Sequence, residues 1–331
     1  GYSRFDFYPF VYKNLGFFIY VCAMIIIRNA EERRGNAWAA TVGFFDGVQQ
    51  GHRFLIHELR RLADEHGQTA AVFTFPVHPR IVLQADYQPK LLNSFDEKLR
   101  HLATTEADCC AVLDFTRELA TLSAREFIEQ VLWQQWGVRT LLVGYDHRFG
   151  HNREEDFEDY VRYGNELGIE VIHNQAYVLN GVNVSSSVIR SFLQAGEIEM
   201  ATLCLGYSYT LVGKVVHGFA QGRKIGFPTA NIDSTESGQL VPAPGVYAVK
   251  VKIENTVTLL HGMMNIGMRP TFDGSKLTLE VNIFNFQGDL YGKQLQVVFI
   301  HRIREERKFN NALGLAEQLQ KDCLQIEEQF K

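Results

Sequence analysis

The sequence predicts an α/β domain followed by an all-β domain with a terminal helix. Before residue 205, short apolar runs alternate with stretches of helical periodicity, which is typical of a mostly parallel sheet covered by helices. Between residues 207 and 300 the chain reads as short strands separated by turns, the pattern of an antiparallel barrel. The length of 331 residues also suggests two domains. We therefore expect domains at 24–205 and 206–331, after an atypical extension at 1–23.

The elements of the first domain follow from its hydrophobic pattern. Residues 52–66 and 157–167 carry apolar side chains at helical spacing. Two more helices are expected after the Ser-x-x-Glu capping boxes at 94–97 and 123–126, in which both side chains satisfy backbone N–H groups. Strands are expected at 25–27, 39–45, 70–75, 111–113, 140–143 and 169–172, and a last helix is expected at about 310–330 in the second domain.

Polar and glycine-rich residues gather where three of the expected strands end, at 46–52, 75–79 and 144–150. Ligands of parallel sheets bind at the carboxyl ends of the strands, so these three segments are expected to form a site. The first of them also joins a strand to a helix N-terminus, where free backbone N–H groups favour anions. The sequence therefore predicts a ligand-binding site at this edge of the sheet, with a loop that favours anions.

Composition argues against several classes of partner. The formal net charge is −5, and the 33 basic residues are dispersed along the chain, so no nucleic-acid or membrane partner is expected. The five cysteines include one adjacent pair but no CxxC pair, which argues against a disulfide framework or a zinc site. Reduced thiols in the cytoplasm are the simplest interpretation.

The first 23 residues differ from the rest of the chain. Residues 2–12 are rich in aromatic side chains, and 15–27 form an apolar run that is too short to span a membrane. No small-residue cleavage site of a signal peptide follows this run. We expect Met24 to be the natural start and 25–27 to open the first strand.

The run GKVVHGFAQGRKIGFPTAN at 213–231 is the most informative segment of the chain. Its spaced glycines let the backbone approach a bulky anion, and Arg223 and Lys224 add positive charge beside them. Thr229 and Asn231 add neutral oxygens of the kind that a hard cation prefers. Glycines in small barrels also serve simply to turn corners, so this run by itself leaves both interpretations open.

This segment resembles the riboflavin kinase (flavokinase) family, whose GRxxGxPTAN motif stands at 222–231. Four further motifs of that family follow in order, at 244–247, 265–272, 279–292 and 304–309. The resemblance implies transfer of the γ-phosphoryl group of ATP to the 5′-hydroxyl of riboflavin. It implies Glu280 as the general base; nucleotide binding by Gly218, Gly222, Arg223, Gly226, Thr229 and Asn231; Mg²⁺ binding by Thr229 and Asn231; and flavin contacts from Arg304, Glu306 and Phe309.

The pattern around Glu280 has an alternative interpretation. In the stretch Leu277-Thr278-Leu279-Glu280-Val281 the carboxylate shares a face with Thr278, as an ordinary outward strand position would. Family position favours the functional interpretation.

The first domain resembles the bacterial FAD synthetase family of HxGH nucleotidyltransferases, which have a Rossmann-like fold. Matching motifs stand at 43–52, 74–80, 144–150 and 184–190. The resemblance implies adenylyl transfer from ATP to FMN, with His52 as a catalytic histidine and pyrophosphate as the second product. The implied nucleotide-binding residues are Asp46, Gly51, His52, Asp146, Ser186, Ser187 and Arg190, and the implied flavin contacts are Phe75 and His78. By pattern alone, a serine triplet before a helix is more often an N-cap.

The chain departs from this family's pattern at Gln49, where the motif has its first histidine. Glutamine can donate a neutral N–H group but cannot carry a proton charge. Loss of one preorganised donor typically costs on the order of 100-fold in rate. We therefore expect a robust kinase and a weakened adenylyltransferase.

Together the two resemblances predict a bifunctional enzyme of flavin cofactor synthesis. Its substrates and products would be ATP, riboflavin, FMN and FAD, with Mg²⁺ as the metal. Three alternatives remain open at this point: a kinase whose first domain is inactive, a flavin-binding carrier without turnover, and a nucleotidyltransferase with a different acceptor.

Overall fold

A computed structural model describes residues 24–33, 37–83, 90–145, 147, 155–217, 227–271, 274–309 and 311–330. The expectations for residues 1–23 lie outside this range. The chain folds into two compact units, and the first ends at Val184 where the second begins at Ser185. The short stretch Lys90–Ser94 also belongs to the second unit. The boundary expected at residue 205 therefore falls within the second unit, at the end of its helix α8 (Ile198–Leu205).

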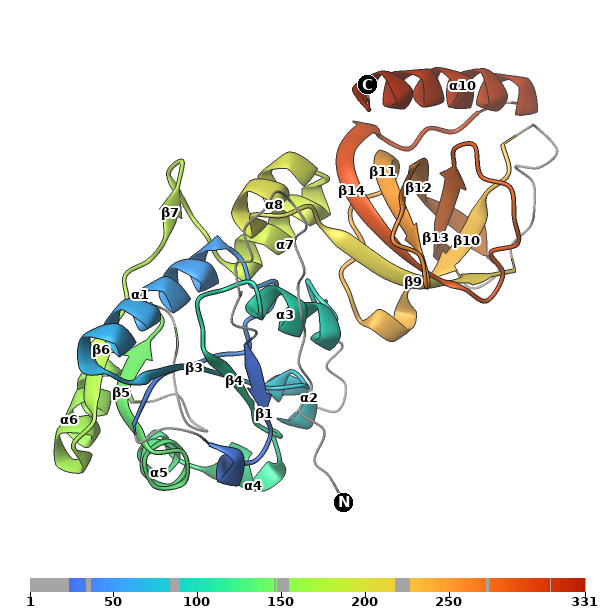
Figure 1. Cartoon of the computed structure of the whole chain (residues 1–331). Helices are drawn as coiled ribbons and strands as arrows, with labels where there is room; N and C mark the ends of the chain where they lie inside the picture. The colour runs from blue at the N-terminus through green and yellow to red at the C-terminus, as the bar shows by residue number, and fades with distance from the viewer. Residues whose placement is uncertain are drawn as a thin grey trace, which may run out of the picture. The chain divides into compact units, whose positions relative to one another are not determined.

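The first unit contains a six-stranded sheet in the order β1-β4-β3-β2-β5-β6, with every neighbouring pair parallel (Figure 1). The strands are β1 (Ile25–Ile27), β2 (Trp38–Val42), β3 (Thr69–Thr74), β4 (Cys109–Val112), β5 (Val138–Val143) and β6 (Glu170–His173). Strand β2 is flanked by β3 on one side and by β5 on the other, so the winding of the chain reverses there. Ligands of such sheets bind at this switch point.

Helices cover the sheet on both faces. They are α1 (Gln50–His66), α2 (Pro79–Leu83), α3 (Phe95–Leu102), α4 (Arg117–Thr121), α5 (Ala124–Glu126) and α6 (Phe157–Leu167), with 3-10 turn η1 (Ala30–Glu32) and π-helical segment η2 (Phe127–Gln135). Two core clusters result. One contains the packed rings of Trp38, Phe73 and Trp136, and the other packs Ile56 and Leu59 of α1 against the opposite face. Burial of both faces explains why these strands read as continuous apolar runs.

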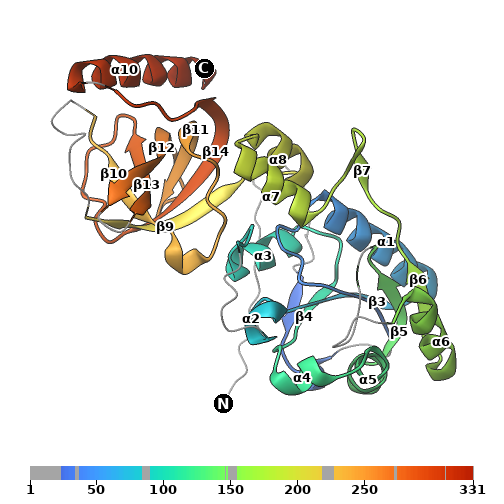
Figure 2. The same cartoon turned by 180° about the vertical axis from the view of Figure 1, so that it is seen from behind.

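The second unit is built on a closed antiparallel barrel in the order β10-β13-β12-β11-β14-β9. Its strands are β9 (Thr210–Val216), β10 (Ala230–Asp233), β11 (Gly245–Ile253), β12 (Leu259–Thr271), β13 (Gly274–Ile283) and β14 (Gln294–Arg304), with turn η3 (Thr235–Ser237). Helix α10 (Ala312–Gln329) packs on the outside of the barrel, where its Ile326 joins Val246, Ala248 and Met263 in a small apolar cluster (Figures 1 and 2).

Two further helices and one strap complete the second unit. Helix α7 (Ser186–Ala195) leads into α8, and α8 is tied to the barrel by a hydrogen bond between Glu199 Oε1 and His301 Nδ1 of β14, at 2.7 Å. The Lys90–Ser94 strap bonds to the segment before β11: the Leu91 N–H donates to the Gly238 carbonyl at 2.9 Å. The first unit ends with a short hairpin, β7 (Val178–Leu179) and β8 (Val182–Asn183).

The predicted fold class is confirmed, and the differences from the predicted elements have local causes. Helix α1 begins at Gln50 rather than residue 52 because the Gln49 side chain caps it. The strand expected at 39–45 ends at Val42, since Phe45 has a φ of +54°. The capping box at 123–126 forms as predicted. In the described part of the chain, no helix has the length and apolarity to cross a membrane.

Candidate active sites in the two units

The loop that follows β2 lies at the switch point of the sheet and carries the predicted residue Asp46, and the first turn of α1 carries Gly51 and His52. Asp46 is 6 % exposed and Val48 is fully buried. Phe45 and Val48 have φ values of +54° and +39°, a backbone conformation that residues other than glycine rarely adopt. Such a loop keeps its shape only where its surroundings hold it, and this is common at functional sites.

Gln49 forms the N-cap of α1. Its Oε1 accepts hydrogen bonds from the backbone N–H groups of Gly51 and His52, the latter at 3.2 Å. A Cβ added at Gly51 would lie 2.8 Å from this oxygen, so the amide lies directly against the glycine backbone. Gln49 therefore occupies backbone donors at the helix end that is expected to bind phosphate.

His52 is held neutral. Burial, and secondarily the charge of Lys98, lower the pKa of His52 to about 3. Its Nδ1 atom is buried and has no hydrogen-bond partner among the described residues, while its ring packs edge-on against Phe45 at 5.1 Å. A neutral imidazole can still donate one N–H group to a phosphoryl oxygen.

This pKa predicts an acid-sensitive first unit. Below pH 6.5 the unfolded histidine binds a proton that the folded one does not, so stability falls as pH decreases toward 3. Between pH 7 and pH 5, His52 should lower the free energy of unfolding of the first unit by about 1–2 kcal/mol. We expect His52→Gln to reduce the fall in melting temperature of the first unit over this range, measured by calorimetry. An unchanged pH dependence would contradict the neutral assignment.

The predicted flavin contacts Phe75 and His78 lie just after β3. Phe75 is 6 % exposed and packs edge-on against Phe115 at 5.3 Å. The His78 ring packs against Phe44 at 4.7 Å, so it adjoins the loop that follows β2. A cavity of about 440 Å³ opens beside the Phe115 segment, between the ends of β1 and β4 and the helices α4 and η2.

Of the other nucleotide contacts predicted for adenylyl transfer, the structure describes Ser186, Ser187 and Arg190. Asp146 lies outside the described residues. Ser186, Ser187 and Arg190 belong to helix α7, whose N-cap is Ser185: its Oγ accepts the Val188 N–H at 3.3 Å. The Nε atom of Arg190 donates to the Lys90 carbonyl at 2.8 Å. The serine triplet thus forms an N-cap, through its first member.

In the second unit, the two residues with the strongest predicted roles are direct neighbours. Asn231 of β10 pairs with Glu280 of β13, and Glu280 pairs in turn with Asn265 of β12. Directly paired residues of antiparallel strands carry their side chains on the same face, with Cβ atoms about 5 Å apart. Val281, the next residue of β13, is 1 % exposed and faces the barrel interior. Because successive side chains of a strand point to opposite faces, Glu280 and both asparagines face outward from the barrel. Sequence motifs located Asn265, but only the register reveals its place beside Glu280.

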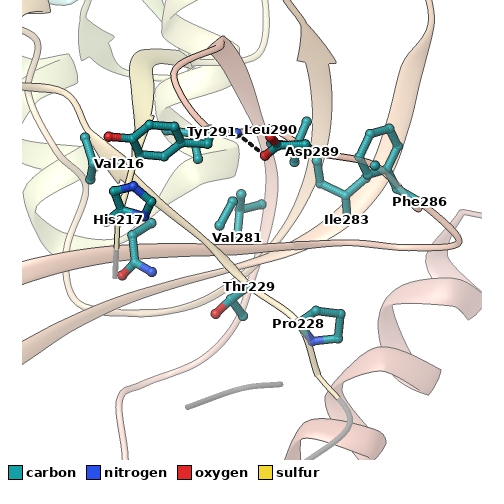
Figure 3. A pocket seen from close by; sticks show the side chains of 14 residues that line it. Val216, His217, Pro228, Thr229, Val281, Ile283, Phe286, Asp289, Leu290 and Tyr291 are labelled. Carbon is teal, nitrogen blue, oxygen red and sulfur yellow. Dashed lines mark hydrogen bonds between the residues drawn. The ribbon is translucent and has the colours of Figure 1, made fainter. Parts of the chain in front are cut away.

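A cavity of about 310 Å³ adjoins this group and is lined by Thr229 and Asn231. The rings of His217 and Tyr291 stack at 3.7 Å at one end, and Phe286 lies at the other (Figure 3). Aromatic walls with a few polar groups are typical of small-molecule sites. The predicted contacts Gly218, Gly222, Arg223 and Gly226 lie outside the described residues.

The predicted flavin contacts at the end of β14 have structural partners. Arg304 forms a bidentate ion pair with Asp322 of α10, with its Nη2 and Nε atoms 2.8 and 3.0 Å from Asp322 Oδ2. The Glu306 carboxylate accepts the Met268 N–H at 3.2 Å, and the Phe309 ring lies 5.8 Å from the Arg304 guanidinium. Because the Asp322 side chain is 2 % exposed, this ion pair fastens α10 to the barrel.

Loss of one partner of this pair should be costly. We expect Asp322→Ala to destabilise the second unit by about 3–5 kcal/mol, because it leaves a buried guanidinium without its counter-charge. Denaturant unfolding followed through the second unit measures this. Replacement of the exposed Glu317 on the same helix is the matched control, with an expected effect within about 0.5 kcal/mol. Equal effects of the two changes would contradict the role of the pair.

Comparisons with known proteins assign each of the two units to a known domain family. The FAD synthetase family model matches residues 31–188, and the riboflavin kinase model matches residues 205–330. The bifunctional riboflavin kinase/FMN adenylyltransferase of Haemophilus influenzae is 37 % identical over 284 residues, covering 86 % of this chain and 91 % of the relative. The chain belongs to the bifunctional riboflavin kinase/FMN adenylyltransferase family.

Two other proteins match over an even larger share of the chain. The Escherichia coli K12 protein of the same name is 36 % identical over 304 residues, covering 92 % of this chain and 96 % of the relative. A crystal structure from Streptococcus pneumoniae, titled as a macrolide-efflux protein, is 32 % identical with a TM-score of 0.77, covering 91 % of this chain and 97 % of its own. Family membership is thus shown along almost the whole described chain.

Proposed function

We propose that the second unit phosphorylates riboflavin to FMN and that the first unit adenylylates FMN to FAD, with ATP as the donor in both reactions. The observation that carries the kinase assignment is the pairing of Asn231 with Glu280 beside a cavity that Asn231 also lines. A carboxylate beside an amide that can ligate a cation, at the edge of a cavity of about 310 Å³, supports phosphoryl transfer.

In the kinase reaction, Glu280 accepts the proton of the riboflavin 5′-hydroxyl as that oxygen attacks the γ-phosphorus of ATP, the bond from the γ-phosphorus to the β,γ-bridging oxygen breaks, and ADP leaves. Asn231 and Thr229 would hold the triphosphate together with Mg²⁺, which would supply neutralisation of the phosphate charge when bound. Their amide and hydroxyl oxygens fit Mg²⁺, which takes few protein ligands and keeps substrate phosphates and water. The stacked His217 and Tyr291 rings form the apolar wall for an aromatic group.

Arg304, Glu306 and Phe309 contribute to the flavin site through the segment they hold. The guanidinium of Arg304 is committed to Asp322, so its part is to keep α10 against the barrel. Glu306 fixes the backbone of β12 at Met268.

In the adenylyltransferase reaction, the FMN phosphate attacks the α-phosphorus of ATP and pyrophosphate leaves. His52 donates a neutral N–H group to the charge that develops on the phosphoryl oxygens. The N-terminus of α1 adds its backbone donors where the phosphate displaces the Gln49 amide oxygen. We assign the contacts with the isoalloxazine ring to Phe75 and His78, and Phe75 packs against Phe115, beside a cavity with room for the ring. The predicted contacts of Asp46 and Asp146 with the nucleotide belong to this proposal, whereas those of Ser186, Ser187 and Arg190, which lie in the second unit, stay predictions from the sequence.

We place both reactions in the cytoplasm. Cys109, Cys110, Cys204 and Cys323 are free thiols, and burial raises the pKa of the Cys110 thiol to about 12. Unreactive reduced cysteines suit a reducing compartment.

One incubation tests the proposal: pure protein with riboflavin, ATP and Mg²⁺, followed by chromatographic separation of FMN and FAD. We expect rapid FMN formation and slower FAD formation. FMN without FAD, even when FMN is supplied directly, would identify a kinase with an inactive first unit. Stoichiometric flavin binding without ATP consumption would identify a carrier, and ATP cleavage to pyrophosphate only with another acceptor would identify a different nucleotidyltransferase.

A further inference from the structure

Lys98 of α3 is a buried cation for which the reactions described above have no use. It is 3 % exposed. The Nζ atom donates to the carbonyl oxygen of Phe44 at 2.9 Å and to that of Phe75 at 2.8 Å. It also lies 3.8 Å from the centre of the Phe44 ring. Lysine is almost never fully buried unless it is paired, so these contacts explain how the charge can be buried here, and the buried charge itself needs a reason.

The two carbonyl groups belong to the two loops of the proposed adenylyltransferase site. Phe44 lies two residues after β2 and opens the loop that reaches His52, whereas Phe75 directly follows β3 and leads to His78. Strands β2 and β3 are parallel neighbours, so one ammonium group joins the ends of both. The hydroxyl of Thr74 also donates to the Phe44 carbonyl at 3.1 Å.

The loop after β2 needs such support. It contains Phe45 and Val48 at positive φ, and such strained residues persist only where the surrounding structure holds them. Burial lowers the pKa of Lys98 to about 8, while the Asp46 carboxylate acts in the opposite direction. The ammonium form therefore predominates at neutral pH, and its bonds to the carbonyls are charge-assisted.

We propose that Lys98 is a positioning residue for adenylyl transfer, holding the phosphate loop after β2 and the flavin loop after β3 in fixed register. It touches neither substrate and acts through the Phe44 and Phe75 carbonyls. This inference rests on the proposed adenylyltransferase activity of the first unit. Small displacements of reacting groups cost large factors in rate, so the effect of losing Lys98 is kinetic as well as structural.

The test compares two variants of one helix in the full-length protein. Lys98→Met keeps the length and apolar stem but removes the charge and the donors. Leu99→Ala is the matched control: Leu99 is 3 % exposed in the core cluster, so its truncation destabilises the same helix without touching either carbonyl. For each variant, kcat and KM for FAD formation from FMN are measured per folded molecule, with FMN formation by the second unit as the internal reference.

We expect Lys98→Met to lower kcat for FAD formation at least tenfold and to raise KM for FMN, with FMN formation within twofold of the wild type. Leu99→Ala should leave both constants within threefold. Hydrogen exchange gives a readout independent of turnover: in Lys98→Met, amides of 43–52 and 75–78 should exchange at least tenfold faster, and those in the second half of α1 should not.

Two results would overturn the proposal: unchanged exchange and kinetics in Lys98→Met, or equal effects of Lys98→Met and Leu99→Ala. A wild-type protein that makes FMN but no FAD would instead contradict the proposed function of the first unit. In that case the exchange measurement alone decides whether Lys98 positions the two loops.

Discussion

Replacement of Glu280 by Gln is expected to lower the rate of FMN formation by about 100-fold or more, the usual contribution of a general base. Glutamine keeps the shape of the side chain but cannot accept the proton of the riboflavin hydroxyl. Asn231→Ala should have a comparable effect, because Asn231 pairs directly with Glu280 and lines the cavity. Initial rates at saturating ATP and riboflavin measure both.

The control for these variants lies on the same strand. Thr278 shares the outward face of β13 with Glu280, two residues away, so Thr278→Val tests whether any change on this face disturbs catalysis. FAD formation from supplied FMN should remain normal in all three variants, which shows that the first unit is intact. Retained turnover in Glu280→Gln would remove Glu280 from the role of base.

Substitution of Gln49 by His is expected to raise the rate of FAD formation at least tenfold. Gln49 bonds to the N–H groups of Gly51 and His52, so a phosphate that uses this helix end must displace its amide oxygen. A histidine at this position can donate to the phosphoryl group and can carry a positive charge when protonated. Rates with FMN and ATP, measured beside the kinase activity of the same sample, test the change.

The neighbouring Gln50 provides the matched control. It is the first residue of α1 and does not cap the helix, so Gln50→His adds a histidine nearby without freeing the backbone donors. We expect no more than a twofold change for Gln50→His. A Gln49→His rate equal to or below that of the wild type would show that glutamine is no handicap at this site.

The sequence was sufficient to predict the fold class, because two different hydrophobic periodicities meet in one chain. It could not supply the register of the barrel, on which the pairing of Glu280 with both Asn231 and Asn265 depends. Strand pairing arises from contacts distant in sequence, and a shift of one residue would turn Glu280 to the other face.

The candidate site residues likewise include features that the sequence shows and features that only the packing reveals. The sequence shows that Gln49 stands where the family motif has a histidine. It does not show that the Gln49 side chain caps α1, because glutamine is not among the preferred N-cap residues. Lys98 carries no signal in the sequence, because Glu-Lys pairs on helices are usually solvated. Here both Glu97 and Lys98 are buried, which only the packing of α3 against the strand ends reveals.

The Lys90–Ser94 strap has a consequence for attempts to express the two activities separately. The polypeptide enters the second unit at Lys90, returns to the first at Phe95, and crosses again at Ser185. A fragment starting at residue 206 would lack the strap that bonds to Gly238, and also the Glu199 partner of His301. A single cut before residue 206 would therefore yield a second-unit fragment of reduced stability. A fragment that begins at Ser185 and is supplied with a peptide spanning 90–94 should recover that stability.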